Sequence, residues 1–241
     1  MNQKLLPVGE LIKQSWELFK ANFKTFFVIA LLLTVVSVIP SLASRSFPSA
    51  ETDAPLTPWT GVGFLVGAII VVFISLWGEL ALLSEALTPG QSLGNLFSST
   101  VDKIGAVLFI SFMVGLIVIA GIILLIIPGI IFSIWYAFAP IILLDEKLRG
   151  WEALKSSREL VKGFFGQVFS RLFAAAIIFG AIYIPLTIIF KQNPVVNDIV
   201  TGILSLFLGP LFVIYEVMLY KNLKEIKSVP QEIPQTNEPQ A

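Results

Sequence analysis

The feature that most constrains this chain is an apolar run over residues 104–144 that contains no charged side chain. Its 41 residues are about twice what one α-helix needs to cross a bilayer. Pro128 and Gly129 stand near the middle, where a helix most readily ends. We therefore expect two membrane spans, over residues 104–127 and 128–144, with a kink at Pro140 in the second.

Four further apolar segments have the length of a membrane span. They cover residues 22–40, 61–83, 164–190 and 198–220. Pro185 interrupts the third and Gly209-Pro210 the fourth, so both helices are expected to be broken. Ser41-Leu42-Ala43 resembles a signal-peptide cleavage site, but the long patterned segment before it favours a retained span.

The composition agrees with a chain whose solvent is mostly lipid. Hydrophobic residues make up 56% of its 241 residues and charged residues 13%, and the mean hydropathy is +0.88. A soluble domain has roughly a quarter of charged residues. We expect an all-α, six-span domain over residues 1–227, an exposed loop at 41–60, a polar loop at 84–102, and a disordered Pro- and Gln-rich tail at 228–241.

The placement of Lys and Arg predicts the orientation, because cytoplasmic loops carry the excess of these residues. With six spans and both termini inside, 14 of the 16 lie on the inner side, and Arg45 and Lys191 lie outside. If residues 104–144 formed a single span, only 6 would lie inside. The charges therefore favour six spans with cytoplasmic N- and C-termini.

Two amphipathic segments, over residues 8–24 and 150–163, each precede a span. Such a pattern is typical of helices that lie in the membrane interface on its cytoplasmic side. The alternative is an amphipathic helix that packs on protein. If the segments are interfacial, the candidates for contact with lipid headgroups are Trp16, Lys20, Trp151, Lys155, Arg158 and Lys162.

The same two segments resemble each other. A shift of 142 residues aligns Glu10 with Glu152, Ser15 with Ser157, and five further identical pairs within fourteen positions. A weaker third copy covers residues 91–103. Our hypothesis is three repeated units, each an interfacial helix followed by a two-span hairpin. The alternative is chance similarity between amphipathic helices.

Several classes of function are disfavoured by what the chain lacks. It contains no Cys and no His, so thiolate catalysis, a His base and the usual zinc ligands are absent. The net charge is zero, which argues against nucleic-acid binding. We find no catalytic constellation, metal site or cofactor motif, and expect no enzyme.

Three charged residues fall inside the expected spans. Glu79 and Glu216 lie near the cytoplasmic ends of the second and sixth spans, and Arg171 lies about two turns into the fifth. A charge in hydrocarbon is costly unless it is paired or hydrated. We therefore expect Arg171 to pair with one of the glutamates, in either a functional polar site or a purely structural ion pair.

Several motifs resemble one known family. They are Ile127-Pro128-Gly129-Ile130, Tyr136-Ala137-Phe138-Ala139-Pro140, Leu144-Asp145-Glu146, the segment from Glu152 to Gly163, and Leu219-Tyr220. The chain resembles the membrane domain of glycerophosphoryl diester phosphodiesterases and its stand-alone bacterial relatives. The resemblance implies an uncharacterised six-span protein of the bacterial inner membrane. It does not imply phosphodiesterase activity, because in that family the activity belongs to a separate soluble barrel with His and acidic metal ligands.

Two hypotheses of function remain. The first is a non-catalytic membrane module that organises membrane lipids or membrane-protein partners, or that self-associates. It rests on the repeated interfacial helices and on the lack of catalytic groups. The second is a small permease, suggested by the broken helices and by the charges in the inner half of the spans.

Overall fold

Helices account for nearly all of the described chain. The computed structural model describes residues 4–46, 58–124 and 126–228, and these residues contain no β-strand. The helices are, in order, α1 (Val8–Ala21), α2 (Phe23–Ser46), α3 (Pro58–Leu87), α4 (Leu93–Val101), α5 (Ile104–Leu124), α6 (Ile126–Tyr136), α7 (Ala139–Asp145), α8 (Trp151–Val161), α9 (Phe165–Ile189) and α10 (Pro194–Ser228). The expected all-α class is confirmed for these residues. The predicted tail lies outside them from residue 229 onward.

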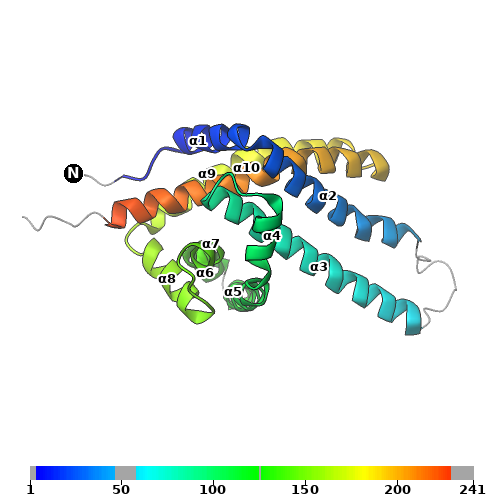
Figure 1. The fold of residues 1–241 in the computed structure, drawn as a ribbon, viewed down its shortest axis with the longest axis horizontal. Coiled ribbons are helices and arrows are strands. Elements are labelled where there is room, and N and C mark those ends of the chain that lie inside the picture. The colour runs from blue at the N-terminus through cyan, green and yellow to red at the C-terminus, as the bar shows by residue number, and fades with distance from the viewer. Residues whose placement is uncertain (1–3, 47–57, 125, 229–241) are drawn as a thin grey trace, which may run out of the picture.

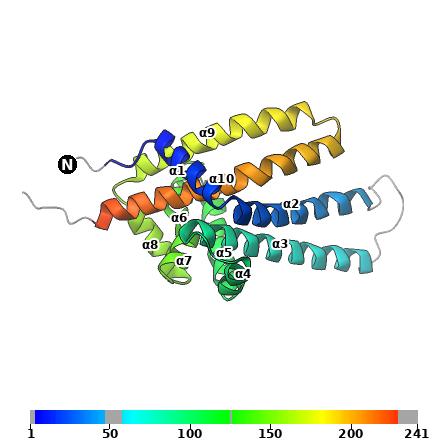
Figure 2. The same ribbon diagram turned by 45° about the horizontal axis from the view of Figure 1, so that its top comes forward.

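Six helices form three hairpins, α2–α3, α5–α6 and α9–α10 (Figure 1). Four of these helices, α2, α3, α9 and α10, run along the long axis of the molecule, and α10 lies between α9 and α2 (Figure 2). The α5–α6 hairpin is seen nearly end-on in Figure 1, so it crosses the direction of the other two. Helix α10 is central, because it packs against α1, α2, α3, α8 and α9.

The long helices expose apolar side chains to an extent that water would not tolerate. Ile69 is 68% exposed, Ile123 79% and Ile188 65%. Such surfaces are stable only in an apolar solvent. Five helical segments of the described chain are long and apolar enough to cross a membrane: Leu65–Leu87, Ile104–Ile123, Ile126–Asp145, Phe165–Ile189 and Pro194–Ser228. The bent pair of α1 and α2 makes a sixth if the pair is counted as one span.

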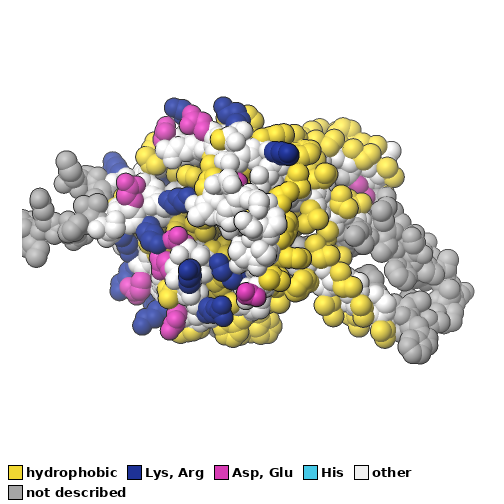
Figure 3. Space-filling model, viewed as in Figure 1, with side chains coloured by type: hydrophobic (Ala, Val, Ile, Leu, Met, Phe, Trp, Pro, Cys, Tyr) yellow, Lys and Arg dark blue, Asp and Glu magenta, His cyan; other side chains and the backbone are white. Residues whose placement is uncertain are grey.

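Charged and apolar side chains occupy opposite ends of the molecule. Most of the Lys, Arg, Asp and Glu side chains in view gather over α1, α8 and the C-terminal part of α10, and hydrophobic side chains dominate the described part of the opposite end (Figure 3). We call this region the charged end. Both ends of the described chain lie there (Figure 1), which agrees with an even number of membrane crossings.

Helix α1 meets α2 at an angle of 93°. The bend falls at Asn22, whose backbone N–H and side-chain amide both donate to the carbonyl of Leu18. The apolar face of α1 is buried against protein, since Leu11 is 0% exposed and Phe19 contacts Phe207 of α10. This face is therefore packed on protein, as the alternative reading of the sequence expected, while Trp16 remains exposed. That α1 also lies in the membrane interface stays a prediction.

Helix α8 is also packed on protein by one face. Its buried residues include Ala153, Ser157 and Val161. The hydroxyl of Ser157 donates to the carbonyl of Trp135 on α6 at 2.7 Å. The Arg158 guanidinium lies 4.5 Å from the centre of the Trp135 ring, a cation–π contact that holds the helix against α6.

The long apolar run does divide into two, but a few residues before the expected position. Helix α5 ends at Leu124 and α6 begins at Ile126, so Pro128 lies in the first turn of α6. Proline is tolerated in a first turn because the N–H groups there have no partner within the helix. At Pro140 the chain does more than kink: α6 ends at Tyr136 and a separate helix, α7, begins at Ala139.

Other helices are longer than expected. Helix α2 continues through Pro40 to Ser46 and α3 begins at Pro58, so both take in part of the predicted loop, whose residues 47–57 lie outside the described chain. The expectation of broken helices at Pro185 and Gly209-Pro210 is wrong, because α9 and α10 each run through their proline as one helix.

Candidate functional site

A pocket of about 670 Å³ lies among α2, α3, α9 and α10. Most of its wall is apolar, and includes Leu33, Leu82, Phe179 and Phe212. Its polar side chains are Thr34, Ser37, Ser75, Glu79, Tyr183 and Ser205. The pocket therefore combines an apolar wall with hydroxyl groups and one carboxyl group, as small-molecule sites commonly do.

Small and helix-distorting residues leave room for this pocket. Gly180 and Gly209 line it, and a Cβ added at Gly209 would meet no atom within 4 Å. Pro210 has no N–H, so it leaves the carbonyl of Leu206 without its usual helical partner. Gly209 and Pro210, which were expected to break α10, thus line the pocket, although the helix continues through them.

Glu79 is placed by a close contact between α2 and α3. A Cβ at the preceding residue, Gly78, would lie 2.5 Å from Cδ2 of Leu33, so a larger residue there would require the Leu33 side chain to shift. Glu79 itself lines the pocket and is exposed to it. Its carboxyl group interacts electrostatically with that of Glu216 on α10. Within the described chain neither side chain forms a hydrogen bond or a salt bridge.

Arg171 does not join these glutamates, which corrects the expectation of an ion pair. Its guanidinium donates to the carbonyl oxygens of Leu6 at 2.9 Å and Leu5 at 2.7 Å, and to that of Gln167 at 3.0 Å. The backbone N–H of Leu6 in turn donates to the side chain of Asn222. Arg171 therefore anchors residues 4–7, the N-terminal strap, to α9, and Asn222 anchors the strap to α10.

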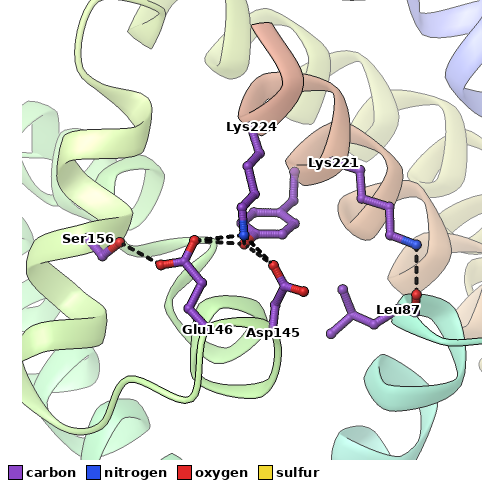
Figure 4. Close-up of polar contacts among 7 residues, drawn as sticks. Leu87, Asp145, Glu146, Ser156, Lys221 and Lys224 are labelled. Carbon is purple, nitrogen blue, oxygen red and sulfur yellow. Dashed lines mark hydrogen bonds and ion pairs between the residues drawn. The ribbon is translucent and has the colours of Figure 1, made fainter. Parts of the chain in front are cut away.

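The sequence interpretation did not single out a second polar group, the Asp145 cluster, formed by Asp145, Glu146, Tyr220 and Lys224. Figure 4 labels Asp145, Glu146 and Lys224 of this cluster. The Tyr220 hydroxyl donates to Asp145 at 2.7 Å, and the Lys224 ammonium lies 2.6 Å from Asp145 and 2.9 Å from Glu146. These contacts join the end of α7 to α10. Because the acidic and basic groups of the cluster pair with one another, we interpret it as a structural clasp, that is, a set of contacts that holds α7 and α10 together.

Lys221 extends this clasp to a third helix. Its ammonium donates to the carbonyl of Leu87 at 2.9 Å (Figure 4), and to that of Ala86 at 3.2 Å. These carbonyls belong to the last turn of α3, where unpaired carbonyls favour a cation. Two features of the sequence could have indicated this cluster. They are the pair of acids that directly follows an apolar segment, and Tyr220 with the basic residues after it.

Three cations at the charged end have no carboxylate partner among the residues that the structure describes. Lys103 precedes α5, and Lys147 and Arg149 lie between α7 and α8. Burial, together with the nearby Lys147 and Arg149, lowers the pKa of the Lys103 ammonium. Within the described chain none of the three forms a salt bridge. We call them the basic group.

The basic group is held in place by an unusual backbone. Lys147 has a φ of 57°, in the left-handed region that residues other than glycine rarely adopt. Gly150, which follows Arg149, lies against the ring of Phe109 on α5. Phe109 is itself 45% exposed, so the cations lie at the boundary between the charged end and the apolar surface of α5.

The predicted headgroup contacts lie on the surface of α1 and α8 and next to α8. All six are exposed: Trp16, Lys20, Trp151, Lys155, Arg158 and Lys162. Lys20 lies 5.8 Å from the centre of the Trp16 ring, and Lys162 lies 3.6 Å from Glu159. Their positions leave them accessible, and contact with lipid stays a prediction.

No group of acidic residues in the described chain is arranged so that it could hold a metal ion. Comparison with models of known families gives no match, and neither does comparison with solved structures. The class of protein therefore follows from the fold alone. Several long apolar helices with one charged end are the features of a multi-pass membrane protein.

Proposed function

We propose that this protein is a non-catalytic membrane module that organises lipids at its charged end. The observation that carries the proposal is the basic group, Lys103, Lys147 and Arg149. Like charges held together repel, and an anion placed among them would remove that repulsion. Because these cations adjoin the lipid-exposed Phe109, the anion best placed to do so is the phosphate of an anionic phospholipid.

The surroundings of the basic group support this proposal. Trp16 and Trp151 are exposed on α1 and α8, and indole rings favour the headgroup level of a bilayer. The angle of 93° between α1 and α2 suits a helix along the membrane surface that leads into a span. By the excess of Lys and Arg, the charged end faces the cytoplasm, with both termini on that side.

The proposed repeat is supported by the positions that the structure buries. Leu11, Ser15 and Phe19 of α1 correspond, 142 residues later, to Ala153, Ser157 and Val161 of α8, and all six are buried. The helices that follow begin at Phe23 and Phe165, which also correspond. We propose that the two segments are copies of one unit, in a bacterial inner-membrane protein related to the phosphodiesterase membrane domain.

Lipid analysis of the purified protein tests the proposed function. The protein is extracted from native membranes, and the bound lipids are compared with those of the bulk membrane by mass spectrometry. We expect enrichment of anionic phospholipid, and its loss when Lys103, Lys147 and Arg149 are all replaced by Ala.

The matched control replaces Lys13, Lys24 and Lys191 by Ala, which removes the same number of charges elsewhere and should keep the enrichment. Equal enrichment in both triple variants would contradict the proposal, as would a parent protein with no enriched lipid.

A second candidate function is a small permease, favoured by the pocket with Glu79 among four helices. In that case Glu79→Gln or Glu216→Gln should abolish the uptake or efflux of a solute while the amount of protein stays unchanged. If transport persists in both variants, the permease hypothesis fails. If these variants only lower the amount of protein, the two carboxyl groups have a structural role and not a role in transport.

A further inference from the structure

The pocket among α2, α3, α9 and α10 contains a carboxyl group, that of Glu79, with no basic partner in the described chain. Glu79 forms no hydrogen bond or salt bridge within the described chain, and none of the residues that line the pocket is Lys or Arg. Glu216 adds a second carboxyl group within electrostatic range. The pocket therefore has a cation-attracting end with no cation of its own.

Two of its hydroxyl groups, those of Ser37 and Ser205, favour a ligand that donates hydrogen bonds. The Ser37 hydroxyl donates to the carbonyl of Thr34 at 2.8 Å, and the Ser205 hydroxyl donates to that of Thr201 at 2.8 Å. Both protons are thus committed to the helix backbone, and the remaining lone pairs of the two oxygens can only accept. A ligand that donates hydrogen bonds matches these two oxygens, while the hydroxyl groups of Thr34, Ser75 and Tyr183, which also line the pocket, can donate as well as accept.

The rest of the wall suits an apolar body. Phe179 and Phe212 meet edge to face, with ring centres 5.6 Å apart, and Leu33 and Leu82 lie on the opposite helices. Aromatic rings pack against apolar groups and also attract cations. A purely apolar ligand, or an anionic one, would leave a carboxyl group buried without a partner, which is costly.

From these contacts we infer that the pocket binds a lipophilic cation: a protonated amine or similar nitrogen cation attached to an apolar body. The positive group lies against Glu79, its N–H groups reach the hydroxyl oxygens of Ser37 and Ser205, and the body packs on Phe179 and Phe212. The volume of about 670 Å³ is in the usual range for small-molecule sites. The inference requires binding alone, so it stands apart from both proposed functions.

The test uses the full chain in nanodiscs of uncharged lipid and three fluorescent probes. Ethidium is a lipophilic cation with N–H donors, N-phenyl-1-naphthylamine is neutral, and anilinonaphthalene sulfonate is anionic. Fluorescence anisotropy of ethidium should show saturable binding to the parent protein. Glu79→Gln, which keeps the side-chain shape, should weaken this binding about tenfold or more, because it removes a charge-assisted contact.

Two control variants separate charge from volume and folding. Glu17→Gln makes the same change on the exposed surface of α1 and should bind ethidium like the parent. Gly209→Leu fills the pocket without a Cβ clash and should weaken both ethidium and the neutral probe, whereas Glu79→Gln should spare the neutral probe. The inference is overturned if Glu79→Gln binds ethidium as tightly as the parent, if the parent prefers the anionic probe, or if the parent does not bind ethidium.

Discussion

Arg171 illustrates how a cation inside a membrane helix can be satisfied without a carboxylate. Its guanidinium presents five donors in a rigid fork, and three of its hydrogen bonds end on the backbone carbonyls of Leu5, Leu6 and Gln167. Leu5 is only 3% exposed. Together with Gln167 and Asn222, which accept from the backbone N–H groups of Leu5 and Leu6, this side chain fixes the N-terminal strap against α9 and α10 and brings a further apolar residue into the core.

Removal of this side chain should release the strap. We expect Arg171→Ala to lower the free energy of unfolding by about 2 kcal/mol, because hydrogen bonds to a charged group contribute roughly 1.5–3 kcal/mol each and part of the loss is recovered by water. The strap should also become sensitive to protease ahead of Val8. Thermal unfolding in detergent and limited proteolysis measure the two effects. Lys191→Ala, on an exposed turn, is the control; equal behaviour of the two variants would show that Arg171 does not hold the strap.

At the scale of elements, the α5–α6 hairpin depends on two glycines that face each other. A Cβ built on Gly121 would lie 2.9 Å from both Cα and N of Gly129. The obstacle is backbone, which cannot rotate away as a side chain can. Any residue larger than glycine at position 121 would therefore force the two helices apart. Such close approach is common where membrane helices pack on small residues.

We expect Gly121→Ala to destabilise the protein by about 1–3 kcal/mol, because the methyl group forces the hairpin apart. The control is Gly115→Ala on the same helix, where a Cβ meets no atom within 4 Å. That change should be neutral or slightly stabilising, because Ala favours the helix over Gly. Unfolding of both variants in mixed micelles gives the comparison. If the two variants are equally stable, the close approach of Gly121 to Gly129 does not require glycine at position 121.

At the scale of the whole molecule, the separation of charged and apolar side chains defines one direction across the membrane. The strap and the last turn of α10 both lie at the charged end, while the turn between α9 and α10 lies at the opposite end (Figures 1 and 3). Lys191 and Gln192 belong to that turn. In a bilayer these two ends should face opposite compartments.

The chain has no Cys, so single cysteines report this topology directly. We expect Glu17→Cys on α1 and Glu152→Cys on α8 to react with an impermeant maleimide only when the inner face is open, and Gln192→Cys only from outside. All three positions are exposed. If Gln192→Cys were labelled from the same side as Glu17→Cys, the proposed membrane orientation of α9 and α10 would be wrong.

The sequence by itself determined the class of protein, the approximate positions of the long helices and the charged end. Residues 104–144 show why: the length of an uncharged apolar run and the placement of Lys and Arg are local properties, and transfer into lipid depends on them alone. The break in this run was found within a few residues, because the proline lies in the first turn of α6.

Only the tertiary structure decided which faces and groups meet. Arg171 needed a partner, and the sequence offered Glu79 and Glu216 as charges, whereas the actual partners are backbone carbonyls 165 and 166 residues away. Every residue has such a carbonyl, so composition cannot reveal which one is chosen. The buried face of α1, the Gly121–Gly129 contact and the pocket beside Glu79 likewise arise from packing between distant segments, which depends on the shape of the whole bundle.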